Sequence, residues 1–229
     1  MSKLKAAGVP NELKPAFASA EEKIKGFFSD ITMIPEQGRI QINGTRFMWA
    51  QARGLAMTFR NSVTEIFGEK GSDQILYRFG QALGRNEARA FHERFGLVDP
   101  MERLAAGPIY FAYSGWAFVD ILPSSAPRPD EDYILTYHHP GSFEAEVFLS
   151  DNITSSHPVC FINAGYSSGW CAESFNIPLD AREVSCAAAG DENCTFIMTH
   201  SSRMLERQQR FRELLQNKPA SEITTEELL

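Results

Sequence analysis

The residues that most constrain the fold of this chain lie in one short segment, REVSCAAAGDENCTF, at positions 182–196. It places Glu183, Cys186 and Cys194 within twelve residues, in a chain with only four cysteines. Such a segment forms a disulfide loop, a reactive thiol site or part of a metal site. Because the N-terminus lacks the apolar core of a secretory signal, we expect a cytoplasmic location, where cysteines are more often metal ligands or buried thiols than disulfides.

The other two cysteines, Cys160 and Cys171, are eleven residues apart in a segment with helical character. On one helix their side chains would lie roughly 16 Å apart along the axis, so both cannot bind the same ion. Cys160 lies near the helix start, whereas Cys171 lies in an apolar run and is predicted to be a buried thiol. Spacing leaves Glu183, His157 and His200 open as the fourth ligand, with a slight preference for histidine, the commoner zinc ligand.

The bulk composition excludes several classes of function. The 229-residue chain carries a formal net charge of −7, and 43% of its residues are hydrophobic. The hydrophobic fraction is large enough for the core of one compact domain with a helical tail. The negative net charge argues against a surface that neutralises nucleic-acid phosphates. The sequence contains no run of about 18 apolar residues, which a membrane-spanning helix would need. We therefore expect no direct nucleic-acid contact and no membrane segment.

Helical periodicity dominates the first half of the chain. Apolar residues at helical spacing predict helices at 11–31, 49–67 and 72–95. Ser72 and Asp73 are capping candidates for the last of them. Gly80 and Gly84 share one face of that helix and predict a close helix-packing contact. At 39–49, alternating apolar residues around an Asn-Gly dipeptide predict a tight β-hairpin.

After about position 108 the pattern becomes extended. Aromatic and β-branched residues predict antiparallel strands at 109–122, 132–139 and 141–149. A helix is predicted at 157–176, strands on both sides of AAAGDEN, and a polar helix at 202–216, followed by a flexible tail. Within that polar helix, a narrow seam at coiled-coil spacing is formed by Met204, Gln208, Phe211 and Leu215. The predicted fold class is α+β, an antiparallel sheet flanked by helices.

Five stretches in this order carry a family resemblance: RFGQALGRNEA, AAGPIYFAYSGW, GSFEAEVFL, HPVCFINAGYSSGW and REVSCAAAGDENC. Together they resemble the N-terminal sensory domain of XylR/DmpR-type activators of aromatic catabolism, which joins an activator-N module to a vinyl-4-reductase-type module. The resemblance covers about residues 38–196. It implies an N-terminal helical segment at 1–37, an effector-sensing domain at 38–200 whose zinc-binding half is about 135–200, and a linker helix with a flexible tail at 201–229.

The resemblance implies both a ligand and a metal. In that family the domain binds a small aromatic effector and controls an attached AAA+ ATPase that drives sigma-54-dependent transcription. A structural zinc lies beside the effector pocket, and its ligands fall here on Cys160, Glu183, Cys186 and Cys194. A zinc ion with four protein ligands has no open position for water or substrate, so the resemblance implies a regulatory domain and no enzyme.

The implied effector pocket departs from the family pattern. Phenol-responsive members hold the phenol hydroxyl with a histidine and a tryptophan, and the corresponding positions here are Phe111 and His139, which makes a different effector the expectation. By position, the pocket would be lined by Leu104, Phe111, Trp116, Tyr137 and His139. A buried His139 would need a polar partner, such as an effector hydroxyl or carboxylate; alternatively it faces water at the strand end.

Other functions remain open at this stage. No GxxxxGK[ST] motif occurs, so the chain is either a sensor fragment with an ATPase module in cis or a free-standing relative. As a sensor it would form a homodimer through its N-terminal helix and hairpin. The alternatives are an enzyme of tetrapyrrole metabolism, for which Glu144 and Glu146 on one strand face would be the carboxylates, and a dimerisation scaffold.

Overall fold

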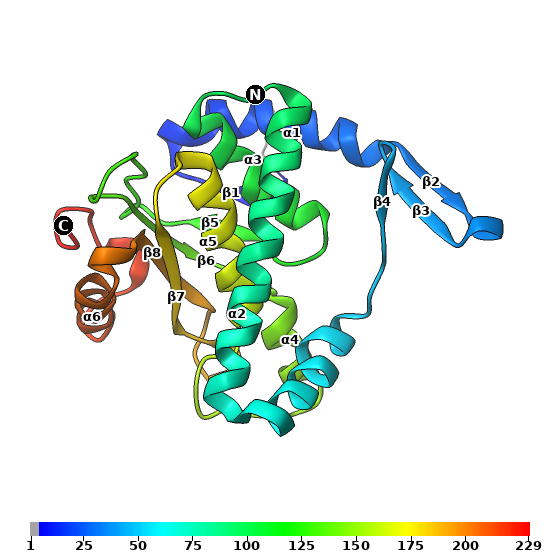
Figure 1. The fold of residues 1–229 in the computed structure, drawn as a ribbon. Helices are drawn as coiled ribbons and strands as arrows, with labels where there is room; N and C mark the ends of the chain where they lie inside the picture. The colour runs from blue at the N-terminus through cyan, green and yellow to red at the C-terminus, as the bar shows by residue number, and fades with distance from the viewer. Residues whose placement is uncertain (1–4) are drawn as a thin grey trace.

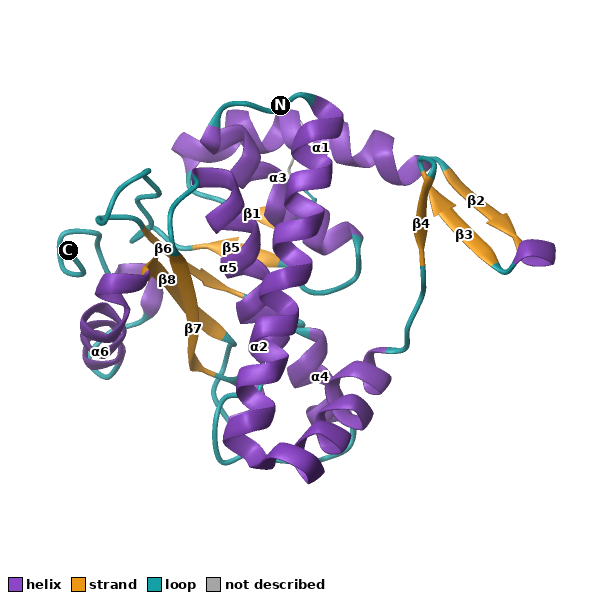
Figure 2. Ribbon diagram, viewed as in Figure 1, coloured by secondary structure: helices purple, strands orange, loops and turns teal. Residues whose placement is uncertain are grey.

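The computed structural model describes residues 5–229 and contains two β-sheets (Figures 1 and 2). The larger sheet has the order β1-β5-β6-β8-β7, in which β1 is parallel to β5 and every other pair is antiparallel. Its strands are β1 Ala7–Gly8, β5 Val119–Ile121, β6 Ile134–His138, β7 Leu179–Ser185 and β8 Thr195–His200. The smaller, antiparallel sheet consists of β2 Ile31–Ile34, β3 Arg39–Ile42 and β4 Thr45–Phe47.

Helices lie on both sides of the larger sheet, which confirms the predicted α+β class (Figure 2). They are α1 Lys14–Ser29, α2 Arg60–Phe95, α3 Pro100–Tyr113, α4 Phe143–Ser150, α5 Phe161–Phe175 and α6 Met204–Leu215. Helix α5 packs on β7, α2 packs on α5, and α6 contacts β7 and β8. None of the helices between residues 5 and 229 is both long and apolar enough to cross a membrane.

The predicted hairpin is confirmed and carries an additional strand. Asn43 and Gly44 connect β3 to β4 with φ values of 49° and 76°, the left-handed geometry that a tight two-residue turn requires. Strand β2 pairs with β3, although the helical pattern of the sequence continued to Ile31. The small sheet projects from the body of the protein (Figure 1). Arg94 of α2 anchors it by donating hydrogen bonds to Asn43.

Helix α2 breaks at Gly68, between the two predicted helices, but the predicted caps Ser72 and Asp73 do not start the second one. Gly68 has φ 69° and ψ 171°, and a π-helical turn at Gly54–Phe59 precedes α2. Ser72 is buried inside the helix, and Asp73 pairs with Arg60 at 3.3 Å. The carboxylate therefore closes the bend across Gly68 instead of capping a new helix.

Two segments predicted as strands are helical. Residues 109–113 are the last turns of α3, which begins where the Asp99 carboxylate accepts hydrogen bonds from Met101 N and Glu102 N. Residues 143–149 belong to α4. Both segments are rich in aromatic and aliphatic residues because they are buried, and burial on several sides hides the helical period.

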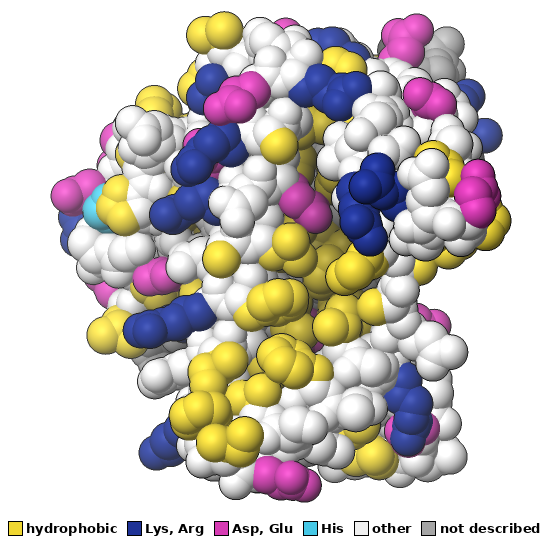
Figure 3. Space-filling view, turned by 45° about the vertical axis from the view of Figure 1, so that its right-hand side comes forward, with side chains coloured by type: hydrophobic (Ala, Val, Ile, Leu, Met, Phe, Trp, Pro, Cys, Tyr) yellow, Lys and Arg dark blue, Asp and Glu magenta, His cyan; other side chains and the backbone are white. Residues whose placement is uncertain are grey.

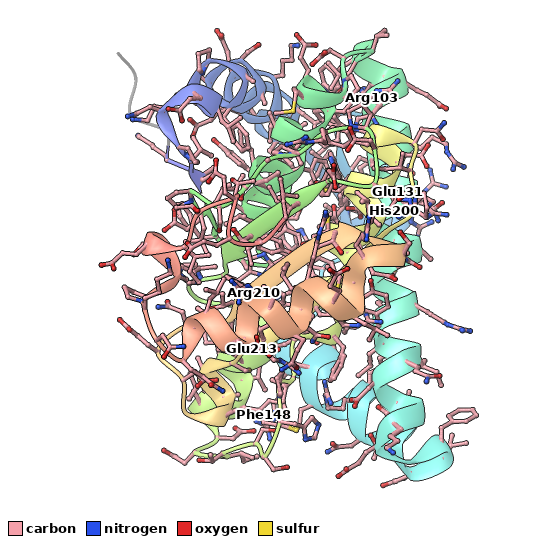
Figure 4. The ribbon with its side chains drawn as sticks, turned by 90° about the vertical axis from the view of Figure 1, so that its left-hand side faces the viewer. Arg103, Glu131, Phe148, His200, Arg210 and Glu213 are labelled. Atoms are coloured by element: carbon pink, nitrogen blue, oxygen red, sulfur yellow. The ribbon has the colours of Figure 1, made fainter. Side chains whose placement is uncertain are left out.

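The C-terminal segment packs against the outer face of the larger sheet, where the sequence predicted a linker helix and a flexible tail (Figure 4). Phe211 of α6 is fully buried, and the guanidinium of Arg207 donates hydrogen bonds to Glu131 O, Tyr133 O and the Asp132 carboxylate. The buried apolar cluster at this interface consists of Leu122, Ile134, Ile197, Phe211, Ala220, Ile223 and Leu228. The predicted coiled-coil seam of α6 thus packs on the larger sheet of the same chain and not on a second helix.

Helices α2 and α5 pack tightly through glycines, as predicted for Gly80 and Gly84. A Cβ atom added to Gly84 would lie 2.2 Å from Tyr166 O, and one added to Gly80 would lie 2.2 Å from Ile162 O. From the other side, a Cβ on Gly165 would lie 2.0 Å from Tyr77 O. Any side chain would therefore force the two backbones apart.

We expect Gly84→Ala to destabilise the domain, although alanine favours a helix by about 1 kcal/mol over glycine. Overpacking against a rigid backbone carbonyl costs about 1–3 kcal/mol and outweighs that gain. Chemical unfolding of both variants would measure the change, with Gly26→Ala in α1 as the control because nothing lies within 4 Å of its added Cβ. Equal stabilities for the two variants would contradict the packing argument.

Candidate metal centre and buried cavity

Four candidate ligands converge between the start of α5 and the β7–β8 connection. Cys160 immediately precedes α5, Glu183 lies on β7, Cys186 follows β7 and Cys194 precedes β8. All four are buried, and one ligand atom from each lies within 4.8 Å of the others. The structure thus brings together the four residues implied by the family resemblance.

The geometry of this cluster fits a metal ion. The Sγ atom of Cys194 lies 3.7 Å from that of Cys160 and 3.9 Å from that of Cys186. A disulfide needs about 2.05 Å between sulfurs. In contrast, two thiolates on a tetrahedral ion with bonds of about 2.3 Å lie about 3.8 Å apart. Glu183 Oε2 accepts a hydrogen bond from Cys160 N at 2.9 Å, while its buried Oε1 has no partner and is free to coordinate.

Electrostatics favour a cation at this position. Burial raises the pKa of the Cys160 thiol and of the Glu183 carboxyl well above their ordinary values. Hydrogen bonds from the Cys160 and Cys194 thiols lower the pKa of Cys186 well below its ordinary value, so this thiol ionises most readily of the three. Since ionising four buried groups without a counter-charge is costly, a divalent ion that binds all four would offset it.

Neighbouring residues orient the ligands. The Ser142 hydroxyl lies 3.1 Å from Cys160 Sγ and accepts a hydrogen bond from Asn163 Nδ2 at 2.8 Å. In the connecting loop, Cys186 N donates to the Asp191 carboxylate at 2.7 Å. Gly190 turns this loop with a φ of 98°. Such second contacts fix the direction of a ligand and contribute to metal affinity.

Glu144 and Glu146 do not share a strand face, because they lie on α4. Glu144 is buried and accepts hydrogen bonds from Ile162 N and Asn163 N at the start of α5. Burial raises the pKa of Glu144 to about 7. Glu146 is exposed at the surface. Glu144 therefore holds the first turn of α5 beside the metal cluster.

The other candidate ligands lie outside the cluster. His157 Nδ1 contacts the Ser156 hydroxyl at 3.3 Å, and His200 Nδ1 contacts the Ser202 hydroxyl at 2.7 Å. Cys171 is buried on α5, where burial raises its pKa to about 12. It is the buried thiol that the sequence predicted.

Replacing Cys186 or Cys194 with serine should release the bound metal, because a neutral hydroxyl is a poor substitute for thiolate. Loss of the ion would also lower the melting temperature, since binding to the folded state stabilises it. Native mass spectrometry and thermal unfolding would measure both effects. Cys171→Ser is the matched control and should keep the metal; loss of the ion from that variant would refute the assignment.

A second feature is a small apolar cavity between α3, α5 and the larger sheet. Its volume is about 30 Å³. A protein cavity known to bind benzene measures about 150 Å³, so the walls must move to admit an aromatic ring. The cavity is lined by Gly107, Pro108, Phe111, Val119, Leu135, Tyr137, Tyr166, Ser167, Trp170, Cys171 and Met198.

The predicted pocket residues occupy different positions relative to this cavity. Phe111 and Tyr137 line it. The rings of Trp116 and His139 lie behind the wall, with centroids 5.8 Å and 5.4 Å from that of Phe111. Leu104 is fully buried on α3 but is not a lining residue.

Sequence reasoning missed the contribution of α5. Tyr166 and Trp170 are both fully buried and line the cavity, one helical turn apart. Their spacing places them on the same face of a helix and was the available signal. Tyr166 also donates a hydrogen bond of 2.5 Å to the Glu87 carboxylate on α2.

His139 is the most unusual polar residue near the cavity. It is 1% exposed, neither ring nitrogen has a hydrogen-bond partner, and burial lowers its pKa to about 3. The imidazole is therefore neutral at pH 7 and does not face water, which excludes the strand-end alternative. The ring centroid of Tyr137 lies 5.0 Å from that of His139, and the buried Tyr137 hydroxyl also lacks a hydrogen-bond partner. Buried polar groups are normally paired, so this region has unused hydrogen-bonding capacity.

Comparison with known proteins gives two family matches and two curated relatives. Residues 27–124 match the family described as activator of aromatic catabolism, and residues 142–200 match the vinyl-4-reductase domain family. The chain is 23% identical over 176 residues to the transcriptional regulatory protein XylR of Pseudomonas putida, covering 77% of this chain and 31% of XylR. It is 23% identical over 174 residues to the phenol regulator MopR of Acinetobacter guillouiae, covering 76% of this chain and 31% of MopR. The chain thus spans about a third of the length of these relatives.

Among solved structures, the fold is similar to the phenol-responsive sensory domain of the transcription activator PoxR. The TM-score is 0.70 at 18% identity, and the match covers 88% of this chain and 98% of that one. At this identity the likeness shows the fold. Together with the two family matches and the two relatives, it confirms the resemblance to the aromatic-effector sensory domains of XylR/DmpR-type activators.

Proposed function

We propose that this chain, which combines an activator-of-aromatic-catabolism module with a vinyl-4-reductase-type domain, is a ligand-sensing regulatory domain for a small aromatic effector. The observation that carries the proposal is the aromatic cavity with unpaired polar groups beside it. The relatives support it, since MopR is a phenol regulator and the PoxR domain is phenol-responsive. No catalytic role is part of this proposal.

The effector would occupy the enlarged cavity with its polar group near His139. The position that the family resemblance assigns to a phenol-binding histidine is Phe111, whose ring centroid lies 5.4 Å from that of His139. A neutral imidazole can both donate and accept a hydrogen bond. We therefore favour a single-ring aromatic other than phenol, with a hydroxyl or carboxylate that pairs with His139, because exchanging the polar groups of a site changes the ligand that it accepts.

The metal in this proposal is a structural zinc bound by Cys160, Glu183, Cys186 and Cys194. Three thiolates and a carboxylate form a sulfur-rich set that zinc prefers, and four protein ligands leave no position for a reacting water. The ion would fix the start of α5, and α5 supplies four of the cavity-lining residues. Zinc would thereby brace the effector site.

The effector would act on a larger protein. Because the matched relatives are about two and a half times as long as this chain, we propose that the domain controls an AAA+ ATPase of a sigma-54-dependent activator in cis. An effector would shift the conformational equilibrium of such a protein only by binding one conformation more tightly than another.

We further propose a homodimer. Figure 3 shows hydrophobic side chains gathered over α2 and in the hollow beside the projecting hairpin. The exposed large apolar residues of this region are Met48, Trp49, Ile66, Phe67 and Phe79. Extensive exposed apolar surface marks interaction sites in soluble proteins. The N-terminal region would thus contribute to association.

Binding of simple aromatics should raise the melting temperature of the zinc-loaded protein, because a ligand of the folded state stabilises it. A panel of benzene, phenol, alkylphenols and benzoate tests this, with cyclohexanol as the non-aromatic comparison. His139→Phe should reduce binding of hydroxylated aromatics by about fivefold while benzene binding changes little, since one hydrogen bond is worth about 1 kcal/mol. An unchanged melting temperature across the whole panel would exclude the pocket.

A paired substitution, Ile66→Glu with Phe67→Glu, should shift the protein from dimer to monomer. Charged groups in an apolar interface are costly, whereas at an exposed, unpartnered surface they cost little. Sedimentation velocity measures the change, with Leu205→Glu on the exposed side of α6 as the matched control. A wild-type protein that sediments as a monomer at high concentration would contradict the dimer.

A further inference from the structure

An open groove lies on the outer side of the cavity wall. Its volume is about 500 Å³, and it runs between the turn after α3 and the start of α4. Gly115 and Gly141 lie along it with φ values of 79° and 67°, so the backbone turns tightly on both sides. The lining of the groove includes the aromatic residues Tyr113, Trp116, Phe118 and Phe143.

The side chain of Trp116 lies between this groove and two residues of the cavity wall. Trp116 lines the groove and is half-buried, and its ring stacks on Phe111 at 5.8 Å with an interplanar angle of 15°. It also lies 5.4 Å from the ring of Tyr166. Phe111 and Tyr166 both line the cavity, and their own centroids are 4.8 Å apart. The indole therefore covers, from the groove side, the contact between two residues of the cavity wall.

Trp116 differs from the residues that line the cavity in its place on the chain. Every lining residue of the cavity belongs to α3, α5 or a strand of the larger sheet, where regular backbone hydrogen bonding holds the chain. Trp116 lies in the turn between α3 and β5. Its backbone N–H donates a hydrogen bond to Phe111 O at 3.2 Å, and its backbone carbonyl accepts one from Phe143 N at 3.0 Å. The side chain can thus rotate into the groove without breaking a helix or a strand.

We infer that Trp116 is the gate of the cavity and that small uncharged aromatics enter from the groove when its ring swings away from Phe111 and Tyr166. This inference deepens the proposed function, on which it rests for the identity of the ligand. The entry route itself can be tested without the effector, because Cys171 lies in the cavity and supplies a chemical reporter.

The experiment measures how fast methyl methanethiosulfonate, a small uncharged thiol reagent, modifies Cys171 in the metal-loaded full chain at mildly alkaline pH. Peptide mass spectrometry separates Cys171 from the metal-binding cysteines. We expect rates in the order Trp116→Ala, Trp116→Phe, wild type. Trp116→Ala should be faster by about tenfold, equivalent to about 1.4 kcal/mol less free energy of opening. Trp116→Phe keeps a ring in place and provides the test if the alanine variant fails to fold.

Phe118→Ala is the control, because Phe118 lines the groove without being part of the aromatic contact with Phe111. It should leave the rate within about twofold of wild type. Equal acceleration in the Phe118 and Trp116 variants, or no acceleration in either Trp116 variant, would overturn the gate. Saturating benzene should protect Cys171. If the Trp116 variants react faster but no aromatic protects, the gate stands and the proposed ligand class fails.

Discussion

The contact on which the rest of this structure depends is the glycine-mediated packing of α2 against α5. Backbone atoms of the two helices approach so closely that Gly84 faces the Tyr166 carbonyl and Gly165 faces the Tyr77 carbonyl. Because Cys160 lies at the start of α5 and Tyr166, Trp170 and Cys171 lie along it, this packing holds the helix that joins the candidate metal site to the cavity. Glycine is required there for proximity, at the expense of helix propensity.

Local signals in the sequence predicted the elements whose geometry is local. The Asn-Gly turn, the packing glycines and the strands around Cys186 and Cys194 are as expected. The prediction of a strand at 109–113 was wrong because aromatic content was taken as β propensity, and tertiary burial overrides such preferences. The break at Gly68 falls between the predicted helices 49–67 and 72–95, but the capping role expected of Ser72 and Asp73 was wrong because both residues lie inside the helix that follows.

The site was only partly predictable from the residues themselves. Spacing supplied two cysteines but could not choose among Glu183, His157 and His200, because the fourth ligand depends on how β7 lies against the start of α5. The family resemblance chose Glu183, and the structure places that carboxylate in the cluster. The cavity was harder still, since its wall combines residues from α3, α5, β5, β6 and β8 that are distant in sequence.

The larger sheet separates two interiors that share the same strands. Along β6, Leu135 and Tyr137 face the cavity, while Ile134 points to the packing of the C-terminal segment. Along β8, Met198 faces the cavity and Ile197 faces the C-terminal segment. Neighbouring residues on one strand cannot move independently, so widening the cavity by shifting these strands would compress the apolar layer beneath α6. The volume available to a ligand is therefore limited by how far the apolar layer between the sheet and α6 can be compressed. Arg207 of α6 strengthens this limit, because its hydrogen bonds hold the 131–133 segment just before β6.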